Sequence, residues 1–276
     1  MEKSTDQKVP AFERLIYQIC QEEGIDVQFL SRNWVLRLQK GDEVHYVVGY
    51  KFDLNSQGTG LVADDKFATF EALERAGVPV IQHEILYELS DQTAHALGYN
   101  SMPYIISFFQ KHNRQIIIKA NNGTCGRQVF KVTNLDQLIE VLPRVFKQSY
   151  SASMCPFYDI RHEYRMILLD GEEKLSYSKV KNDDAYCFNL DCGAQAVAMP
   201  QERHAEVLTL AQRAARAINL RFGSVDVIET ADGELMVLEI NSGVMTRHYL
   251  EQHPDKLSTV QEMYREAVRK MFGKIC

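Results

Sequence analysis

The sequence predicts an α/β protein with α+β lobes, preceded by a short N-terminal segment. Three observations support this class. Apolar runs of strand length recur along the chain, for example at residues 115–119, 222–230 and 234–241. Stretches with apolar residues at helical spacing separate several of these runs. The chain of 276 residues is also long enough for two lobes that each bury a core.

Composition excludes several classes of protein and partner. Hydrophobic residues make up 45% and charged residues 25%, which is typical of globular proteins and not of fibrous or low-complexity chains. Lys and Arg number 31 against 37 Asp and Glu, so we expect no nucleic-acid partner. No apolar run approaches the roughly 20 residues of a membrane span. The first fifteen residues lack the apolar core of a secretory signal. We therefore expect a cytoplasmic protein without a membrane partner, whose six cysteines stay reduced.

The first 61 residues are expected to form a short N-terminal α/β segment. Residues 11–22 have apolar side chains at helical spacing, an extended segment follows Gly24, and two alternating runs flank a turn at residues 40–42. Residues 52–60 are polar and rich in turn formers, which predicts a boundary there. So short a segment cannot hold a separate core, so we expect it to pack on the main body or on a second copy in a homodimer.

Residues 62–276 are expected to form the main domain, with a small flap subdomain at about 100–155. Asp64 is expected to cap a helix that ends at Gly77, and an extended piece follows. The pattern then predicts helices and strands in the order helix (90–112), strand (115–119), glycine loop (121–127), strand (128–132), helix (134–147), strand (about 154–158), two strands joined at Asp170-Gly171, an irregular region (182–202), helix (203–219), two strands (222–230 and 234–241) and a terminal helix.

The hairpin SVDVIETADGELMVLEIN is the most informative segment. A two-residue turn at Asp232-Gly233 pairs residues whose numbers sum to 465, so Asp226 lies opposite Glu239 and Ser224 opposite Asn241. Val225, Val227, Leu238 and Ile240 are then expected on the other face. Two carboxylates about 5 Å apart repel by roughly 3 kcal/mol at an effective dielectric of 20. A positive group is therefore expected between them.

Magnesium or manganese is the expected positive group at this hairpin. Asp226, Glu239 and Asn241 supply carboxylate and amide oxygens, and Mg²⁺ usually completes its shell with water and substrate phosphates. That indicates a nucleotide substrate. A solvated acidic hairpin without a ligand is the alternative, although the flanking residues are nearly all apolar. If a metal is the main partner, Asp226→Asn leaves the fold intact or slightly more stable, because the repulsion is removed.

A lysine followed by a glycine-containing loop is the second candidate feature. Lys119 ends an apolar strand, and Asn122, Gly123, Thr124 and Gly126 follow it. Glycines allow backbone N–H groups to approach phosphates, and the lysine adds a charge. The Walker and dinucleotide fingerprints are absent, and a plain hairpin turn is the alternative interpretation.

Two further segments are ambiguous from the residues alone. Lys66 lies in the first turn of its helix, where the helix dipole disfavours a cation unless an anion is near. A surface pair with Asp64 or Asp65 explains it equally. The triplet PFY at 156–158 either lines a slot for a base or belongs to the core.

Taken together, these segments resemble the ATP-grasp carboxylate-amine ligases over about residues 62–250. The likeness rests on the Lys66 helix and on the segments IIIKANNGTCG, PFY, EYRMILLDGE, FNLDCGAQAV and VDVIETADGELMVLEIN. It is greatest for the branch that holds the glutamate-adding ligases and bacterial glutathione synthetase. The segment NSGVMT is also similar to D-alanine:D-alanine ligase.

The resemblance implies two lobes that clasp ATP and a role for each candidate residue. Lys66 and Lys119 would hold phosphates, and the loop with Asn122, Gly123, Thr124 and Gly126 would close over them. The backbone near Phe157 and Tyr158 would meet adenine, and Glu163 would lie near adenine or the ribose. Asp226, Glu239 and Asn241 would bind the metal. Arg165 and Lys179 would stabilise the transferring phosphoryl group, with Lys181 as the alternative to Lys179.

The expected activity is ATP-dependent amide formation through an acyl phosphate, with release of ADP and phosphate. Its substrates would be small-molecule or peptide carboxylates and amines. Two departures leave the substrate open. Cys187 and Cys192 stand where the glutamate-ligase branch has arginines, and the region before residue 62 is short for the family. A non-catalytic protein that binds ATP and magnesium and regulates a partner is the alternative.

Overall fold

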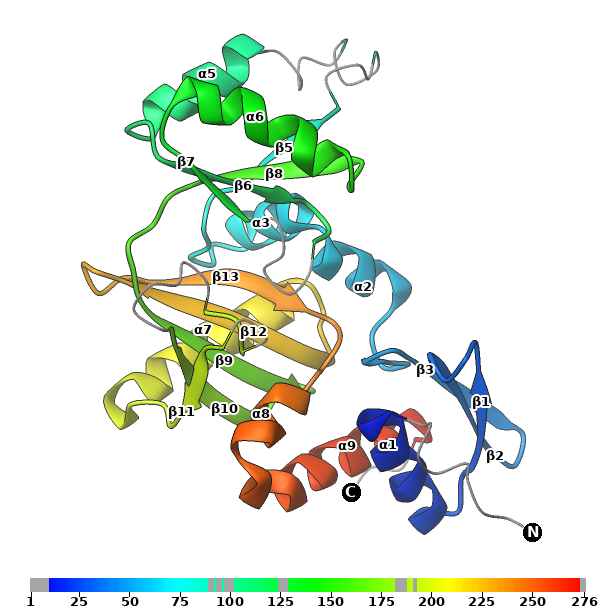
Figure 1. The fold of residues 1–276 in the computed structure, drawn as a ribbon. Coiled ribbons are helices and arrows are strands. Elements are labelled where there is room, and N and C mark those ends of the chain that lie inside the picture. Colours follow the sequence, from blue (N-terminus) through cyan, green and yellow to red (C-terminus); the bar gives the residue numbers. More distant parts are fainter. Residues whose placement is uncertain are drawn as a thin grey trace.

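Three sheets organise the chain, which is described here from a computed structural model (Figure 1). The structure describes residues 10–88, 92, 96, 102–123, 129–181, 188–190 and 193–273. Thr124, Gly126, Cys187 and Cys192 lie outside these residues. Within them, no helix is both long and apolar enough to cross a membrane.

The N-terminal sheet packs on the C-terminal helix, as expected for a segment without its own core. It has the order β1-β2-β3-β4. Phe12, from the first helix, lies against Tyr264 of the last helix, with ring centroids 5.4 Å apart. Arg269 also pairs with Glu23 at 2.8 Å. The elements are α1 (Ala11–Glu22), β1 (Asp26–Leu30), β2 (Val35–Lys40), β3 (Glu43–Val48), β4 (Lys51–Phe52) and α9 (Leu257–Met271).

Two short helices connect this sheet to the rest of the chain, and both correct the sequence interpretation. Residues 57–60, predicted as turn, begin α2 (Gln57–Asp64), which the Ser56 hydroxyl caps by accepting from Thr59 N at 3.0 Å. Asp64 does not cap the next helix, α3 (Lys66–Arg75). Asp65 caps it instead, accepting from Ala68 N at 2.9 Å. Both aspartates suit a cap chemically, so the residue types alone could not choose.

The small lobe is a four-stranded sheet with helices on one face, at the top of Figure 1. Along β6, Ile116 and Ile118 face the helices while Ile117 and Lys119 face the other way. The first strand of this sheet precedes residue 100, where the flap was expected to begin. The elements are β5 (Glu84–Tyr87), α5 (Met102–Lys111), β6 (Ile116–Ala120), β7 (Phe130–Val132), α6 (Leu135–Phe146) and β8 (Ser151–Pro156), in the sheet order β5-β8-β6-β7.

The large lobe is a five-stranded antiparallel sheet covered on one face by α7 (Gln201–Ala217). Ala211 and Ala214 of α7 pack in one cluster with Val225 and Val227. The sequence analysis did not predict β11 or α8. The strands and remaining helix are β9 (Ile160–Leu169), β10 (Glu172–Val180), β11 (Gln195–Val197), β12 (Phe222–Thr230), β13 (Leu235–Asn241) and α8 (Arg247–Gln252), in the sheet order β11-β10-β9-β12-β13.

The carboxylate hairpin has the predicted register from Ser224 to Asp226, but not between Asp226 and the turn. Asp226 is the Cα partner of Glu239, and Ser224 that of Asn241. Beyond Asp226 the register shifts by one, so that Val227 pairs with Val237. The predicted two-residue turn is therefore wrong. Leu238 is the extra residue of a bulge and joins Ile228 on the site face, not Val225 on the other.

The small and large lobes meet around a set of apolar side chains that we call the inter-lobe cluster. Two chain segments link the lobes. One segment contains Val80 and Gln82, and the other contains Tyr158. Val80 forms a parallel bridge with Val237 of β13. Gln82 N donates to the Tyr158 hydroxyl at 3.4 Å, which joins the two segments. The inter-lobe cluster consists of Ile81, Cys155 and Ile228, with Ile117, Tyr158, Ile160, Met236 and Leu238 against them.

Close packing beside the hairpin yields the first prediction. A Cβ on Gly223 would lie 2.4 Å from Asn241 O and 2.9 Å from Leu220, whereas one on Gly58 in α2 meets nothing closer than 3.8 Å. Gly223→Ala should therefore lower the free energy of unfolding by about 1–3 kcal/mol. Gly58→Ala should leave it unchanged or raise it by up to about 1 kcal/mol, because alanine favours helix. Urea unfolding measures both. Equal effects would contradict the packing described at Gly223.

Candidate active site

Two sheet faces and the start of one helix bring the candidate residues together. The face of the small sheet opposite its helices carries Lys119, which is buried. The facing side of the β12–β13 hairpin carries Asp226, Glu239 and Asn241. Lys66 is the first residue of α3, and its charge interacts with both Lys119 and Glu239. Elements from both lobes therefore surround one region.

A buried ion cluster occupies the large sheet at Asp226. The Arg165 guanidinium binds both carboxylate oxygens of Asp226, through Nε at 2.7 Å and Nη2 at 2.6 Å. Lys179 Nζ lies 3.2 Å from the same carboxylate and also binds Glu163. Strand pairing explains this arrangement, because Asp226 is the partner of Arg165 across β12–β9 and Glu163 that of Lys179 across β9–β10.

The pKa values of this cluster follow from burial and from the opposite charges. Burial acts to raise the pKa of Asp226, but Arg165 and Lys179 outweigh it and lower the pKa to about 2. Burial and Arg165 act to lower the pKa of Lys179, yet Asp226 and Glu163 raise it above its ordinary value. Burial raises the pKa of Glu163 against the pull of Lys179. Asp226 is therefore a stabilised anion held by two fixed cations.

This arrangement corrects one expectation from the sequence. The positive group beside Asp226 comes from Arg165 and Lys179, on strands β9 and β10, which the hairpin sequence does not contain. Removing the charge of Asp226 would leave two buried cations with less compensation. The expected gain in stability from Asp226→Asn is therefore wrong in direction, because a stabilised anion has a lowered pKa.

The oxygen donors next to this cluster partly fit a magnesium ion. Glu239 and Asn241 are half-buried, and Asn241 Nδ2 donates to Glu239 Oε1 at 3.2 Å, which leaves the amide oxygen available. Asp226 already binds two cations. Among the described residues no group of three or more His, Cys, Asp and Glu could hold a metal by itself. Glu239 and Asn241 would thus hold Mg²⁺ together with phosphate oxygens, which is how this ion commonly binds.

Lys66 donates hydrogen bonds to two backbone carbonyls next to Lys119 on the small lobe. Its ammonium donates to Asn121 O at 3.0 Å and to Gly123 O at 2.8 Å. Burial lowers the pKa of Lys66 to about 8, against the attraction of Glu239. The surface pair with Asp64 is not formed, because Asp64 binds Lys51 instead. Asn122 is exposed, and its side chain accepts from Ser151 Oγ at 3.4 Å.

The residues proposed to surround adenine lie in different environments. Tyr158 packs in the inter-lobe cluster, which offers an apolar surface between the lobes. Phe157 is half-buried, its N–H donates to Gln115 O at 3.0 Å, and Lys131 Nζ lies 3.4 Å from its ring centroid. Glu163 is buried and pairs with Lys179. Between the two candidate lysines, Lys179 is buried in the ion cluster and Lys181 is exposed.

Sequence reasoning missed three polar residues on this side of the small sheet. His83 is 2% exposed, and its Nδ1 lies 2.6 Å from Ser153 Oγ. Ser153 is the strand partner of Lys119. Asn121 is fully buried beside Lys66. Asn121 directly follows β6 and continues the alternation of Ile117 and Lys119, which could have indicated it, whereas nothing in the sequence singles out His83.

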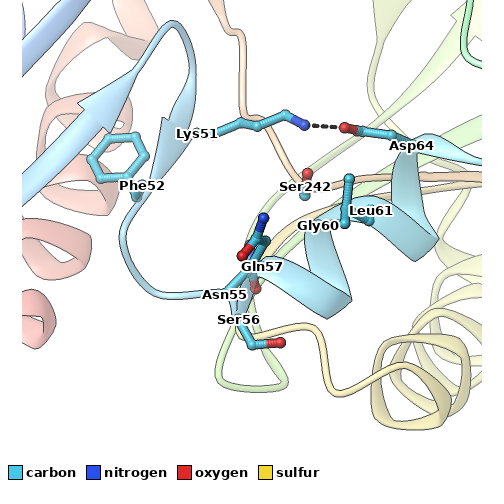
Figure 2. A pocket seen from close by; sticks show the side chains of 9 residues that line it. All are labelled: Lys51, Phe52, Asn55, Ser56, Gln57, Gly60, Leu61, Asp64 and Ser242. Atoms are coloured by element: carbon cyan, nitrogen blue, oxygen red, sulfur yellow. Dashed lines mark hydrogen bonds and ion pairs between the residues drawn. The ribbon is translucent and has the colours of Figure 1, made fainter.

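A pocket of ≈ 230 Å³ adjoins this region at the end of β13 (Figure 2). Lys51 and Asp64 pair across it, and α2 forms one wall. Ser242, which directly follows Asn241, lines it and is 3% exposed, and its hydroxyl has no hydrogen-bond partner in the described part of the chain. The lining residues are Lys51, Phe52, Asn55, Ser56, Gln57, Gly60, Leu61, Asp64 and Ser242.

Solved structures share this fold at low sequence identity. A bifunctional glutathione synthetase from Pasteurella multocida is 16% identical, with a TM-score of 0.58 over 95% of this chain and 44% of that one. D-alanine–D-alanine ligase from Bacillus anthracis complexed with ATP is 16% identical, with a TM-score of 0.59 over 79% and 70%. The ATP-grasp ligase PsnB, complexed with a minimal precursor, Mg and ADP, is 19% identical, with a TM-score of 0.51 over 71% and 55%.

The chain thus spans less than half the length of the glutathione synthetase that it matches. No curated protein matches the sequence. Residues 63–255, which contain every candidate site residue, match the family described as the RimK-like ATP-grasp domain. The fold is therefore ATP-grasp, and the chain belongs to the RimK-like ATP-grasp family.

Proposed function

We propose that the protein is an ATP-dependent ligase that joins a carboxylate to an amine through an acyl phosphate. A carboxylate oxygen of the first substrate attacks the γ-phosphorus of ATP, the bond to the bridging β–γ oxygen breaks, and ADP leaves. The amine then attacks the acyl carbon, loses a proton and displaces phosphate. The product is an amide, with ADP and phosphate released.

One observation carries the proposal. Lys66 and Lys119 from one side, and Glu239 and Asn241 from the other, surround a region between the two lobes of an ATP-grasp fold. Charged donors and a metal-binding pair on opposite walls suit a polyphosphate. The inter-lobe cluster beside them suits a base, because apolar surface favours a stacked heterocycle.

The side chains would act mainly by holding charge, because phosphoryl transfer requires little covalent chemistry from the protein. Lys66 and Lys119 would bind phosphate oxygens. Glu239 and Asn241 would hold Mg²⁺, which neutralises charge that develops on the phosphates. Arg165 faces the same region while Asp226 holds its guanidinium at a fixed position, so it is the candidate for stabilising the transferring phosphoryl group.

The pocket beside Ser242 is the proposed binding place for the carboxylate or amine substrate. Two connections support this. Ser242 directly follows Asn241, and Asp64 lies two residues before Lys66. At ≈ 230 Å³ the pocket is smaller than the roughly 300–1,000 Å³ typical of drug-sized ligands, so it fits a small polar group better than a nucleotide.

A product assay tests the proposed function. The protein is incubated with ATP, Mg²⁺ and pools of amino acids and short peptides, and products are measured by mass. We expect ADP, phosphate and amide in equal amounts, the amide weighing one water less than its two substrates. AMP and pyrophosphate would contradict the mechanism. Thermal stabilisation by ATP and Mg²⁺ without ADP formation in any pool would instead indicate a non-catalytic regulator.

The ion cluster predicts that two carboxylates differ in their effect on stability. Asp226→Asn breaks a buried ion pair and should lower the free energy of unfolding by about 3–5 kcal/mol. Glu239→Gln, at a half-buried residue, should change it by less than about 0.5 kcal/mol. Both should abolish amide formation.

The contribution of Asp226 to the free energy of unfolding is also expected to depend on pH. It is present above the ordinary pKa of 3.8 and is lost as pH falls through about 2. Denaturant unfolding at pH 7 and at low pH measures this. Equal stability of the two variants would contradict it.

The lowered pKa of Lys66 predicts a pH dependence of ATP binding. Below pH 8 the ammonium is charged and binds phosphate. As pH rises through about 8 the free protein loses this proton, so ATP affinity should fall by up to about tenfold per pH unit. Lys66→Arg stays charged and should show a flat profile. Calorimetric titration from pH 7 to 9.5 measures both. A wild-type affinity that does not change over this range would contradict the assignment.

A further inference from the structure

Two buried polar atoms near Lys66 and Lys119 have no hydrogen-bond partner among the residues that the structure describes. They are Nε2 of His83 and Nδ2 of Asn121, in side chains that are 2% and 0% exposed. Leaving a buried polar group unpaired costs about 1–3 kcal/mol. A fold retains such a group most readily where a ligand completes its bonding.

The orientation of His83 is fixed by its other ring nitrogen. Its Nδ1 lies 2.6 Å from Ser153 Oγ. Ser153 is the strand partner of Lys119, so the serine side chain lies on the same face of the sheet as the lysine. If the hydroxyl donates to Nδ1, the neutral imidazole carries its proton on Nε2, which makes Nε2 a donor.

Asn121 is oriented in a similar way. Its Oδ1 accepts from Phe67 N at 3.3 Å, in the first turn of α3, and its backbone carbonyl accepts from Lys66 Nζ at 3.0 Å. Because the amide oxygen is taken by an N–H donor, the remaining Nδ2 is a donor without an acceptor. This N–H therefore belongs to the immediate surroundings of Lys66.

The charges around these donors favour an anion. Burial lowers the pKa of His83 well below its ordinary value, and Lys119 and Lys66 lower it further. The imidazole is therefore neutral at pH 7 and sits among cations. Cys155 also lies in this environment, and burial raises the pKa of its thiol. With its proton on Nε2, the His83 ring joins Asn121 Nδ2 and the two ammonium groups as a donor, and none of these four groups offers an acceptor to the others. A phosphate supplies acceptors to all four.

We propose that His83 and Asn121 are nucleotide-binding residues that donate hydrogen bonds to the polyphosphate held by Lys66 and Lys119. This inference rests on the proposed function only in taking ATP as the ligand. His83 lies outside the segments by which the sequence resembles its family, and Asn121 lies within one of them, IIIKANNGTCG, but was assigned no role there. The two residues would add neutral donors to a site in which further buried cations would repel the lysines.

The test compares variants by calorimetric titration with ATP plus Mg²⁺ and, separately, with adenosine. His83→Phe removes the donor but keeps a ring, whereas His83→Gln keeps an N–H near Nε2. Asn121→Asp keeps the acceptor for Phe67 N but replaces the donor with an anion. His112→Phe is the matched control, because His112 also has a buried Nε2 without a partner but follows α5, on the helix-covered side of the sheet.

We expect His83→Phe and Asn121→Asp to weaken ATP binding by about tenfold or more, which corresponds to one hydrogen bond to a charged group. Adenosine binding should not change, because it has no phosphate. His83→Gln and His112→Phe should stay within about twofold of the wild type. Thermal unfolding of each variant verifies that it is folded, and Asn121→Asp carries the test if His83→Phe does not fold.

Three outcomes would overturn the inference. The first is unchanged ATP affinity in both His83→Phe and Asn121→Asp. The second is an equal loss of affinity for ATP and adenosine, which indicates a distorted fold. The third is a His83→Gln variant as weak as His83→Phe. If the wild type binds ATP as described but forms no amide, the ligase proposal fails and this one stands. If the wild type does not bind ATP, both fail.

Discussion

The contact of Asp226 with Arg165 and Lys179 is the constraint on which the site depends. Three neighbouring strands contribute one charged residue each, and strand pairing sets them side by side. Because side chains alternate between sheet faces, a slip of one residue would turn these charges toward α7 and its apolar cluster. Such a slip would bury unpaired charge, so the same contact that holds Arg165 also fixes the register of the large sheet.

The sequence predicted those features that depend on residues close together in the chain, and it did not predict those that depend on contacts between distant segments. Opposition of Asp226 and Glu239 follows from alternation within one hairpin, and it was predicted correctly. The bulge at Leu238 depends on packing against the other lobe, which the hairpin alone does not reveal. Asp65 and not Asp64 caps α3 because Asp64 is the last residue of α2, a helix that was not predicted. Arg165 and Lys179 were predicted as site residues but not as partners of Asp226. Their contact depends on which strands are neighbours in the sheet, and the sequence of one hairpin does not reveal that order.

The two walls of the site differ in how their charge is compensated. On the large sheet, the carboxylates of Asp226 and Glu163 compensate the cations of Arg165 and Lys179. On the opposite wall, Lys66 donates to backbone carbonyls, and its lowered pKa shows that burial outweighs the nearby carboxylates. Positive charge there is costly until an anion arrives. Among the described residues, one wall thus carries lysines without an ion pair, and the other carries cations whose charge neighbouring carboxylates compensate.

This distribution of charge also determines how nucleotide and metal would enter. Among the candidate residues that the structure describes, the site contains three carboxylates, on Glu163, Asp226 and Glu239, and four cationic side chains, on Lys66, Lys119, Arg165 and Lys179. With Lys66 protonated, its net charge is one positive unit. A lone Mg²⁺ would bring it to three positive units, and ATP with four negative charges would bring it to three negative units. Either is unfavourable in a region shielded from water. Magnesium and ATP together leave one negative unit, so the proposed substrate is the complex of the two.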